Sequence, residues 1–286
     1  MAKDLLQYLS ENRQGLSKGH RAIADYIAKH YDKAAFMTAV KLGAAVGTSE
    51  STVVRFAYEI GYDGYPQLQK ALQEVVRNKL TYMQRIAITD EHADGVDLPE
   101  QVMNRDADNI KSTLSALNRN TFDECVESIL AARNIYIIGV RSSSALASFL
   151  AFYFNLMIPN VRLVSSNTAS EVFEQILRAE TGDVIIGISF PRYSKRTVKA
   201  MQYARSQGAK AIAITDTETS PIAENADLSL FARSNMAAFV DSLTAPMSVI
   251  NALIVAVGMR KKDEVSASFE RLEKIWDEYE VYEKNK

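Results

Sequence analysis

Cysteine is nearly missing from this sequence, and Cys125 is the only one among 286 residues. A single thiol forms no intramolecular disulfide and builds no cysteine-based metal site, and such usage is typical of a reducing cytoplasm. Cys125 lies between Phe122 and Val126 in a stretch with helical apolar spacing, which predicts a buried and inert thiol. We expect no metal ion and no cofactor.

Long hydrophobic runs are also missing. The most apolar stretches, near 145–158 and 246–258, are shorter than the roughly 20 residues that a membrane helix needs. The first residues, Met-Ala-Lys-Asp-Leu-Leu, lack the apolar run of a signal peptide. We therefore expect a soluble, cytoplasmic protein with no membrane partner.

A strong net charge is missing too, since the formal value is −2 at pH 7. The charges are nevertheless unevenly spread. Residues 1–80 hold 11 Lys and Arg against 8 Asp and Glu, which gives +3, and the remainder holds 22 against 27, which gives −5. A mildly basic head on an acidic body weakly favours a DNA-binding module joined to a module that does not bind DNA.

The length and the apolar spacing predict two domains. Residues 1–80 show helical spacing interrupted by Gly and polar clusters, and residues 81–99 are acidic and rich in turn formers. We predict a helical domain at 1–80, a linker at 81–99 and a second domain at 100–286. Helical spacing returns over 100–131 before the pattern changes to alternating strands and helices.

The second domain is predicted to be α/β. Short apolar, β-branched runs predict strands at 134–139, 161–165, 183–189, 210–216 and 227–231. Helices are predicted at 143–157, 168–179, 194–206, 240–259 and 263–282. Continuous apolar strands that alternate with helices indicate a parallel sheet covered on both faces, in a three-layer arrangement. Ligands of such sheets bind beyond the carboxyl ends of the strands.

A helix-turn-helix is predicted inside the first domain. A short helix at 39–46 ends at Gly47, and Ser49 is suited to cap a second helix at 50–60. The amino-terminal residues of such a second helix reach base edges in the major groove of double-stranded DNA. The candidate DNA contacts are Ser49, Ser51, Thr52, Arg55 and Tyr58. A plain helical hairpin in a bundle is the alternative.

Two hydroxyl-rich loops follow predicted strands. The first, 139–144, contains three serines and runs into a helix, whose free N–H groups and dipole suit an anion. The second, 189–197, combines hydroxyls with Arg and Lys. The candidate effector contacts are Ser142, Ser143, Ser144, Glu171, Ser189, Arg192, Tyr193, Ser194 and Thr197. The alternatives are that the serines only cap helices, and that Lys195 and Arg196 form a solvated helix start.

Residues 1–80 resemble the amino-terminal domain of the RpiR/MurR family of bacterial regulators. The matching residues are Leu42, Ala45, Ser49, Ser51, Thr52, Val53, Arg55, Phe56, Gly61, Tyr62, Gly64 and Tyr65. The resemblance implies that Ser51, Thr52 and Arg55 face DNA. It leaves open which of them reads bases and which touches phosphate.

Residues 106–260 resemble the sugar isomerase (SIS) domain, which binds phosphosugars. The matching features are Ile138-Gly139 with Ser142–Ser144, Ile188-Ser189 with Ser194, and 211–216 followed by Ser220-Pro221. The usual second motif, Ser-x-Ser-Gly-x-Thr, departs here, because Pro191 replaces a serine and Arg192 replaces the glycine. Arg192 is expected to take over part of the anion contact, since a guanidinium can bind an anion through two parallel hydrogen bonds.

Taken together, these features predict a bacterial transcriptional regulator of carbohydrate metabolism genes, whose effector is a small phosphosugar or sugar acid. None of the three histidines lies beyond residue 92, which argues against catalysis, and we predict no catalytic residue. A phosphosugar isomerase with an accessory helical domain, using Glu171, is the first alternative. A non-catalytic interaction protein is the second. A homodimer or homotetramer is expected, with 100–131 and 240–259 as candidate interface helices.

Overall fold

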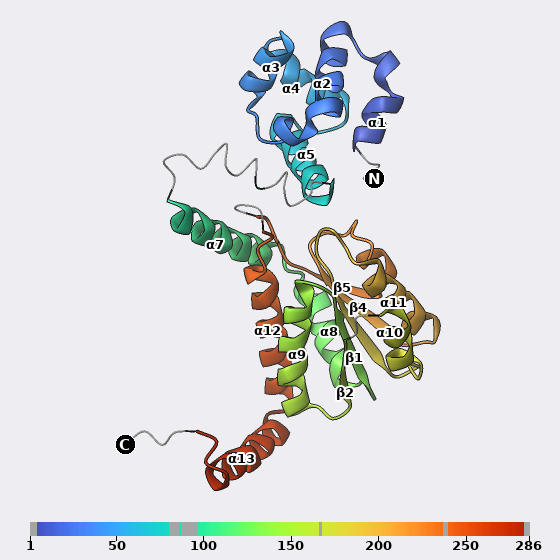
Figure 1. Ribbon diagram of the computed structural model, residues 1–286, viewed down its shortest axis with the longest axis vertical. Helices are drawn as coiled ribbons and strands as arrows, with labels where there is room; N and C mark the ends of the chain where they lie inside the picture. The colour runs from blue at the N-terminus through green and yellow to red at the C-terminus, as the bar shows by residue number, and fades with distance from the viewer. Residues whose placement is uncertain (1–4, 80–85, 87–96, 166–167, 237–239, 283–286) are drawn as a thin grey trace. The chain divides into compact units, whose positions relative to one another are not determined.

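The computed structural model describes residues 5–79, 86, 97–165, 168–236 and 240–282. The chain divides into two compact units, Met1–Val96 and Asp97–Lys286, which are described separately below (Figure 1). Most of the predicted linker at 81–99 lies outside the described residues. The described part of the second unit opens with helix α7, Leu98–Ala116, which Asp97 caps by accepting a hydrogen bond from the Glu100 N–H.

The first unit is helical, as predicted. Its described elements are α1 (Leu5–Glu11), the 3₁₀ turn η1 (Arg13–Gly15), α2 (Lys18–Ala34), α3 (Ala39–Val46), α4 (Glu50–Glu59) and α5 (Tyr65–Lys79). Fully buried side chains from several of these helices form one core, including those of Leu9, Ile23, Leu42, Phe56, Leu68 and Leu72. The helices alone would be marginal at these lengths, so the shared apolar core is what stabilises them.

The α3–α4 hairpin is held by its turn. Gly47 adopts a left-handed conformation with φ of 70°, which costs a glycine little. The N–H of Thr48 donates to the carbonyl of Gly43, and Ser49 caps α4 by accepting from the N–H of Thr52. A side chain at Gly43 would place its Cβ 2.9 Å from the Thr48 carbonyl oxygen, so a glycine allows the two helices to approach closely.

The second unit is built on a five-stranded sheet in which all strands are parallel. The strands are β1 (Ile135–Gly139), β2 (Val161–Val164), β3 (Val184–Ile188), β4 (Lys210–Thr215) and β5 (Leu228–Phe231), in the order β2-β1-β3-β4-β5. All residues of β1 and β3 are buried, which explains their uninterrupted apolar sequence. The predicted α/β fold class is confirmed.

Helices cover both faces of the sheet (Figure 1). On one face α8 (Arg119–Leu130), α9 (Ser143–Met157) and α12 (Thr244–Arg260) share a core with side chains such as Phe154 and Ile250. On the other face α10 (Ala169–Ile176) and α11 (Lys195–Ser206) pack around Ile138, Val172 and Met201. The helices therefore leave two ends of the sheet uncovered. One is formed by the amino ends of the strands and the other by their carboxyl ends.

Several helix bounds differ from the sequence expectation. The stretch 100–131 forms two helices, because the chain turns at Leu117, where the backbone is extended, and Asn118 caps α8. Helix α12 begins at Thr244, four residues later than predicted, and places Pro246 in its first turn, where the missing N–H costs nothing. The last helix, α13, spans Lys262–Glu278 and ends before Glu280, whose φ is 51°.

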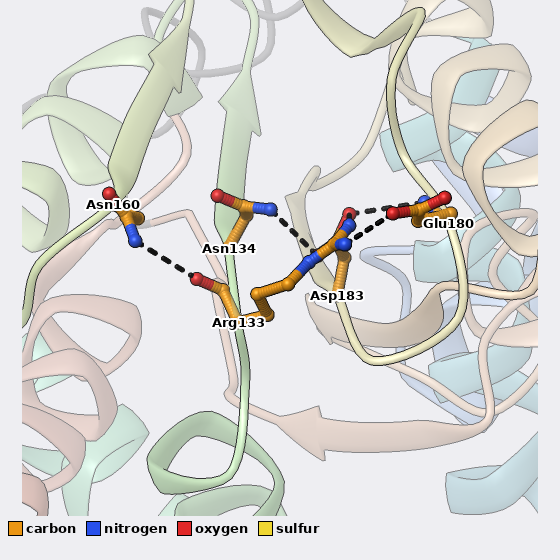
Figure 2. A network of polar contacts seen from close by, with 5 residues as sticks. All are labelled: Arg133, Asn134, Asn160, Glu180 and Asp183. Carbon is orange, nitrogen blue, oxygen red and sulfur yellow. Dashed lines mark hydrogen bonds and ion pairs between the residues drawn. The ribbon is translucent and has the colours of Figure 1, made fainter.

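A polar network ties the amino ends of three strands together (Figure 2). The carboxylate of Asp183, whose side chain is fully buried, accepts from the Arg133 guanidinium at 3.1 and 3.2 Å, from the Asn134 amide at 2.9 Å and from the Glu180 N–H at 3.1 Å. Arg133 also pairs with Glu180, and its carbonyl accepts from Asn160. Because the loops before β1, β2 and β3 all contribute, the network fixes how the amino ends of these three strands are aligned with one another.

Some apolar side chains remain exposed on the outer helices. They include Met103 and Leu114 of α7, Phe152 of α9, and Val255 and Met259 of α12. No described helix is long and apolar enough to cross a membrane. Cys125 is buried as predicted, and burial raises the pKa of its thiol to about 12, which keeps it protonated at neutral pH.

Candidate functional site

The strand order creates a crevice at the carboxyl ends of the strands. β1 pairs with β2 on one side and with β3 on the other, so the chain leaves β1 and β3 in opposite directions. The loop after β1 leads to α9 on one face, and the loop after β3 leads to α11 on the other face (Figure 1). Ligands of sheets with this order bind at the point where the direction reverses.

The β1–α9 loop turns tightly. Gly139 is needed there, because a Cβ at this position would collide with the Ser143 carbonyl and lie 3.0 Å from the Ala147 Cβ. Arg141 has a left-handed backbone with φ of 59°, which costs a residue with a side chain about 1–2 kcal/mol. Its carbonyl accepts from the Ser144 N–H at 3.0 Å and from the Ser144 hydroxyl at 2.5 Å. These two bonds hold Arg141 in that conformation.

The β3–α11 loop is tied internally. The hydroxyl of Ser189 accepts from the Ser194 N–H at 3.1 Å, and the hydroxyl of Ser194 accepts from the Thr197 N–H at 3.4 Å, which caps α11. Tyr193 donates its hydroxyl to Asp216 at 2.9 Å, so the loop is also anchored to the end of β4. Arg192 is exposed and has φ of 22°.

A cavity of about 730 Å³ opens at this edge. It is lined by Ile138, Gly139, Val140, Arg141, Ser144, Val164, Ser165, Glu171, Val172 and Arg196. Its walls thus come from the ends of β1 and β2, the first turns of α9 and α10, and the first turn of α11. The apolar floor carries two guanidinium groups, one carboxylate and two hydroxyls, a composition suited to a small polar anion.

The cavity brings together only some of the predicted effector residues. Ser144 and Glu171 line it. Ser142 is exposed and gives no side-chain cap to α9, Ser143 is buried, and the second loop reaches the cavity through Arg196. Thr197, next to Arg196, is fully buried, and its hydroxyl has no hydrogen-bond partner within the described residues. The effector role of each predicted residue stays a prediction.

The candidate effector contacts named from the sequence do not include the lining residues Arg141 and Ser165. For Arg196, which also lines the cavity, the sequence leaves ligand contact and a solvated helix start equally open. The available signal for Arg141 was an arginine inside a tight turn directly after a buried strand. Ser165 follows the last residue of β2, where the rule about strand ends also applies.

The exposed side of α4 forms the candidate DNA surface. Ser51, Arg55 and Tyr58 are exposed at spacings of four and three residues, which places them on one stripe of the helix. The opposite stripe, with Val53, Phe56 and Ala57, is fully buried. The guanidinium of Arg55 donates to the Ser51 carbonyl at 3.3 Å.

The other two predicted DNA contacts, Ser49 and Thr52, make contacts within the first unit. The hydroxyl of Ser49 lies 2.9 Å from those of Ser51 and Thr52 and accepts from the Thr52 N–H, so Ser49 acts as the helix cap. Thr52 is half-buried, and its methyl group faces Gly19 at the start of α2. Of the five predicted residues, Ser51, Arg55 and Tyr58 are therefore the best placed to reach a partner.

Two family models match the chain. Residues 3–79 match the helix-turn-helix domain of the rpiR family, and residues 128–256 match the SIS domain. The two matched regions fall in the two structural units, and together they span most of the described chain.

Relatives and solved structures agree with these matches. An uncharacterised helix-turn-helix transcriptional regulator from Caldanaerobacter subterraneus is 27% identical over 276 residues, which are 95% of this chain and 96% of the relative. The sugar isomerase domain of an RpiR transcription factor from Sphaerobacter thermophilus has a TM-score of 0.60 at 26% identity and covers 63% of this chain and 99% of its own. The NanR protein of Vibrio vulnificus, solved in complex with ManNAc-6P, has a TM-score of 0.58 at 22% identity over 95% of this chain and 99% of its own.

Proposed function

Since the chain belongs to the RpiR family of helix-turn-helix transcriptional regulators, we propose that its SIS domain binds a phosphorylated sugar or related anion, and that this effector changes the affinity for an operator. The observation that supports the effector most is the cavity at the reversal point of the sheet, lined by Arg141, Arg196, Ser144 and Glu171. Guanidinium groups bind phosphate through paired hydrogen bonds, and Glu171 is suited to accept from sugar hydroxyls. Carbohydrate metabolism genes are the proposed targets.

Helix α7 is the first described element of the second unit, and we assign to it the transmission of effector binding along the chain toward the first unit. Asp106 of α7 accepts from the hydroxyls of Ser242 at 2.5 Å and Thr244 at 2.9 Å, at the start of α12. Asn109 donates to the Asn235 carbonyl at 2.9 Å. A shift of Asn235, or of Ser242 and Thr244, would thus move α7. For an effector to act in this way, its affinity must differ between the two arrangements.

The experiment that tests the effector is a thermal-shift screen of the full-length protein with phosphosugars and sugar acids, followed by DNA binding with and without the stabilising compound. DNA is first selected from a random duplex pool. A ligand at one hundred times its Kd should stabilise the unit it binds by about 2.7 kcal/mol. If no compound raises the melting temperature, or if binders leave the DNA affinity unchanged, the proposed switch is rejected.

Replacing Arg55 with alanine is expected to weaken binding to the selected DNA about tenfold, because a base or phosphate contact from α4 is lost. Fluorescence anisotropy over a series of salt concentrations measures the DNA affinity. The slope of the logarithm of affinity against the logarithm of salt concentration separates a phosphate contact from a base contact. A lost phosphate contact lowers the slope by about one ion, and a lost base contact mainly relaxes sequence preference. Lys29→Ala, which removes an exposed cation of α2 beside Asp25, is the matched control and should change affinity little. Equal effects of both variants would remove the role assigned to Arg55.

An isomerase is the second candidate function, because Glu171 lies in the cavity where a base for proton transfer would have to lie. No histidine occurs in residues 97–286 to assist ring opening, and this favours binding over catalysis. Turnover of a sugar phosphate by the wild type, lost in Glu171→Gln, would reverse this preference.

A homodimer is proposed as the DNA-binding form, since one short recognition helix makes few contacts and two-fold operators match two-fold proteins. The exposed apolar side chains of α7 and α12 are the proposed contact surface, while the opposite side of α12, which includes Ile250 and Leu253, is buried in the core.

A further inference from the structure

Helix α13 forms over 17 residues although none of them is buried within its own chain. Helices in proteins gain most of their stability from packing an apolar face against another element. Figure 1 shows α13 projecting from the ends of α9 and α12, the two helices that it contacts. Within the described residues of one chain, α13 therefore lacks most of the packing that normally stabilises a helix.

An apolar stripe runs along α13. Its members follow one another at spacings of four, three, four and three residues: Val265, Phe269, Leu272, Trp276 and Tyr279. This is the heptad spacing of a helix that packs along a partner helix. Beyond the helix the chain turns back, since the Val281 N–H donates to the Trp276 carbonyl, and the ring of Tyr282 packs edge-on against Trp276 at 5.3 Å between ring centroids. Tyr279 and Tyr282 nevertheless remain 72% and 65% exposed.

A second apolar surface without a partner in the described chain lies on α9 and α12, and we call it the α9–α12 surface. Its residues are Phe152 of α9 and Val255 and Met259 of α12, each 60–63% exposed. Helix α9 contains no charged residue, and α12 contains only Arg260, at its last position. Exposed apolar surfaces that lack charge are typical of the centre of protein interfaces.

The stripe of α13 cannot lie along α12 of its own chain. Two helices that fold back on each other are joined by a loop of about 2–5 residues. Here α12 ends at Arg260 and α13 begins at Lys262, so that Lys261 alone connects them. One chain thus carries two apolar surfaces, and its connection keeps them apart. A second copy can cover both, because each copy then supplies one stripe and receives the other.

We infer that two copies of the chain exchange their last helices, so that the stripe of α13 from each copy packs on the α9–α12 surface of the other. This inference rests on the proposed homodimer and adds α13 and α9 to its contact. Phe152, Tyr279 and Tyr282 of each copy offer on the order of 400 Å² of exposed aromatic surface. The exposed aliphatic side chains add to this area, and a stable interface needs about 800 Å² per partner.

The first test measures the dissociation constant of the dimer by sedimentation equilibrium of the full-length protein. Leu272→Glu places a charge in the stripe, and Phe152→Glu places one on the surface that receives it. Each variant is expected to raise the dissociation constant about a hundredfold, because a buried charge without a partner is costly and each contact of a two-fold dimer occurs twice. Both side chains lie outside the fully buried core, so circular dichroism should show a folded protein.

Ala267→Glu is the matched control. Ala267 is exposed on the side of α13 opposite the stripe, so this variant adds the same charge to the same helix. It should change the dissociation constant less than about threefold, as expected of a surface substitution that buries no charge.

The second test detects the exchange itself by cross-linking between two differently tagged copies of the full-length protein. One copy carries Tyr279→Cys, and the other carries Phe152→Cys, Val255→Cys or Met259→Cys. A short bismaleimide should join the two tagged chains in at least one of these three mixtures. The wild type, whose Cys125 is buried, should give no cross-linked dimer.

The outcomes separate this inference from the proposed homodimer. A wild type that is monomeric at every concentration removes both. A dimer that withstands Leu272→Glu and Phe152→Glu overturns the exchange and leaves the proposed contact through α7 and α12. Cross-linking in none of the three mixtures, or cross-linking of Tyr279→Cys only with itself, also overturns the exchange, and the latter result would show that the two stripes pair with each other.

Discussion

The Gly139→Ala protein is expected to lose binding of every phosphosugar that stabilises the wild type, by more than tenfold. The added Cβ has no free space, since the Ser143 carbonyl carbon lies 2.9 Å from its position and the Ala147 Cβ lies 3.0 Å away. These are atoms of the first turns of α9 that cannot rotate away. The start of α9 must therefore move, and Arg141 and Ser144, which line the cavity, move with it. Overpacking of this kind also costs about 1–3 kcal/mol of stability.

Gly187→Ala is the matched control for that prediction. Gly187 lies in β3, and the Cβ of an alanine there would collide with the side chain of Met201, which is flexible and belongs to the core under α11. This variant should lose stability and lose less ligand affinity than Gly139→Ala, because the clash falls on the flexible Met201 side chain and not on the β1–α9 turn. Melting temperature and calorimetric titration of both variants separate folding from binding. Wild-type affinity in Gly139→Ala would show that the β1–α9 turn is less tightly packed than the structure indicates.

Asp183→Ala is expected to destabilise the second unit by about 3 kcal/mol at pH 7. The fully buried carboxylate accepts hydrogen bonds from Arg133, Asn134 and the Glu180 N–H, and its removal leaves these donors without their partner. Urea unfolding followed by the fluorescence of Trp276, the only tryptophan, reports on this unit. Asp227→Ala is the control, because Asp227 is partly exposed, pairs with Arg205 and accepts one backbone hydrogen bond, from the Ala211 N–H, so its loss should cost about 1–2 kcal/mol.

The contribution of Asp183 also depends on pH. Burial acts to raise the pKa of Asp183, but the hydrogen bonds from Arg133, Asn134 and the Glu180 N–H outweigh it and hold the pKa below its ordinary value. A lowered folded-state pKa gives stability that is present above the unfolded value of about 3.9 and is lost as the pH falls through the folded value. The difference between wild type and Asp183→Ala should thus be full at pH 6 and shrink below about pH 4. A difference that stays constant down to pH 2.5 would contradict the assigned protonation.

Much of the fold could be predicted because burial leaves a periodic trace in the sequence. Strands β1 and β3 are buried on both faces and therefore read as unbroken apolar runs, and the cap at Ser49 follows a glycine that ends α3. Where a helix starts within an apolar stretch is less visible. The sequence places the start of α12 too early because the residue at the N-cap position is Leu243, which makes no side-chain cap to mark the boundary.

The cavity was only partly predictable, since a sequence shows which loops follow strands but not which side chains of those loops converge. The rule about strand ends correctly indicates the carboxyl ends of the strands, and Glu171 and Ser144 are among the residues predicted there. Ser189 and Ser194 are predicted to contact an anion, and in the structure their hydroxyls accept hydrogen bonds from N–H groups of their own loop, so the anion contact stays a prediction. A hydroxyl that caps a helix and one that faces a ligand have the same sequence signature.

The strand order has a consequence for how the chain is made. β1 leaves the ribosome first but lies between β2 and β3, so its central place in the sheet is completed only after residue 188 has been synthesised. Translation at 5–20 residues per second delays β3 by roughly 2–10 s after β1. During that interval the apolar strand β1 lacks its partner β3. The first unit, which has a separate core, has by then been synthesised in full. We expect ribosome-bound chains that end near residue 160 to be protease-resistant in the first unit and protease-sensitive in the second.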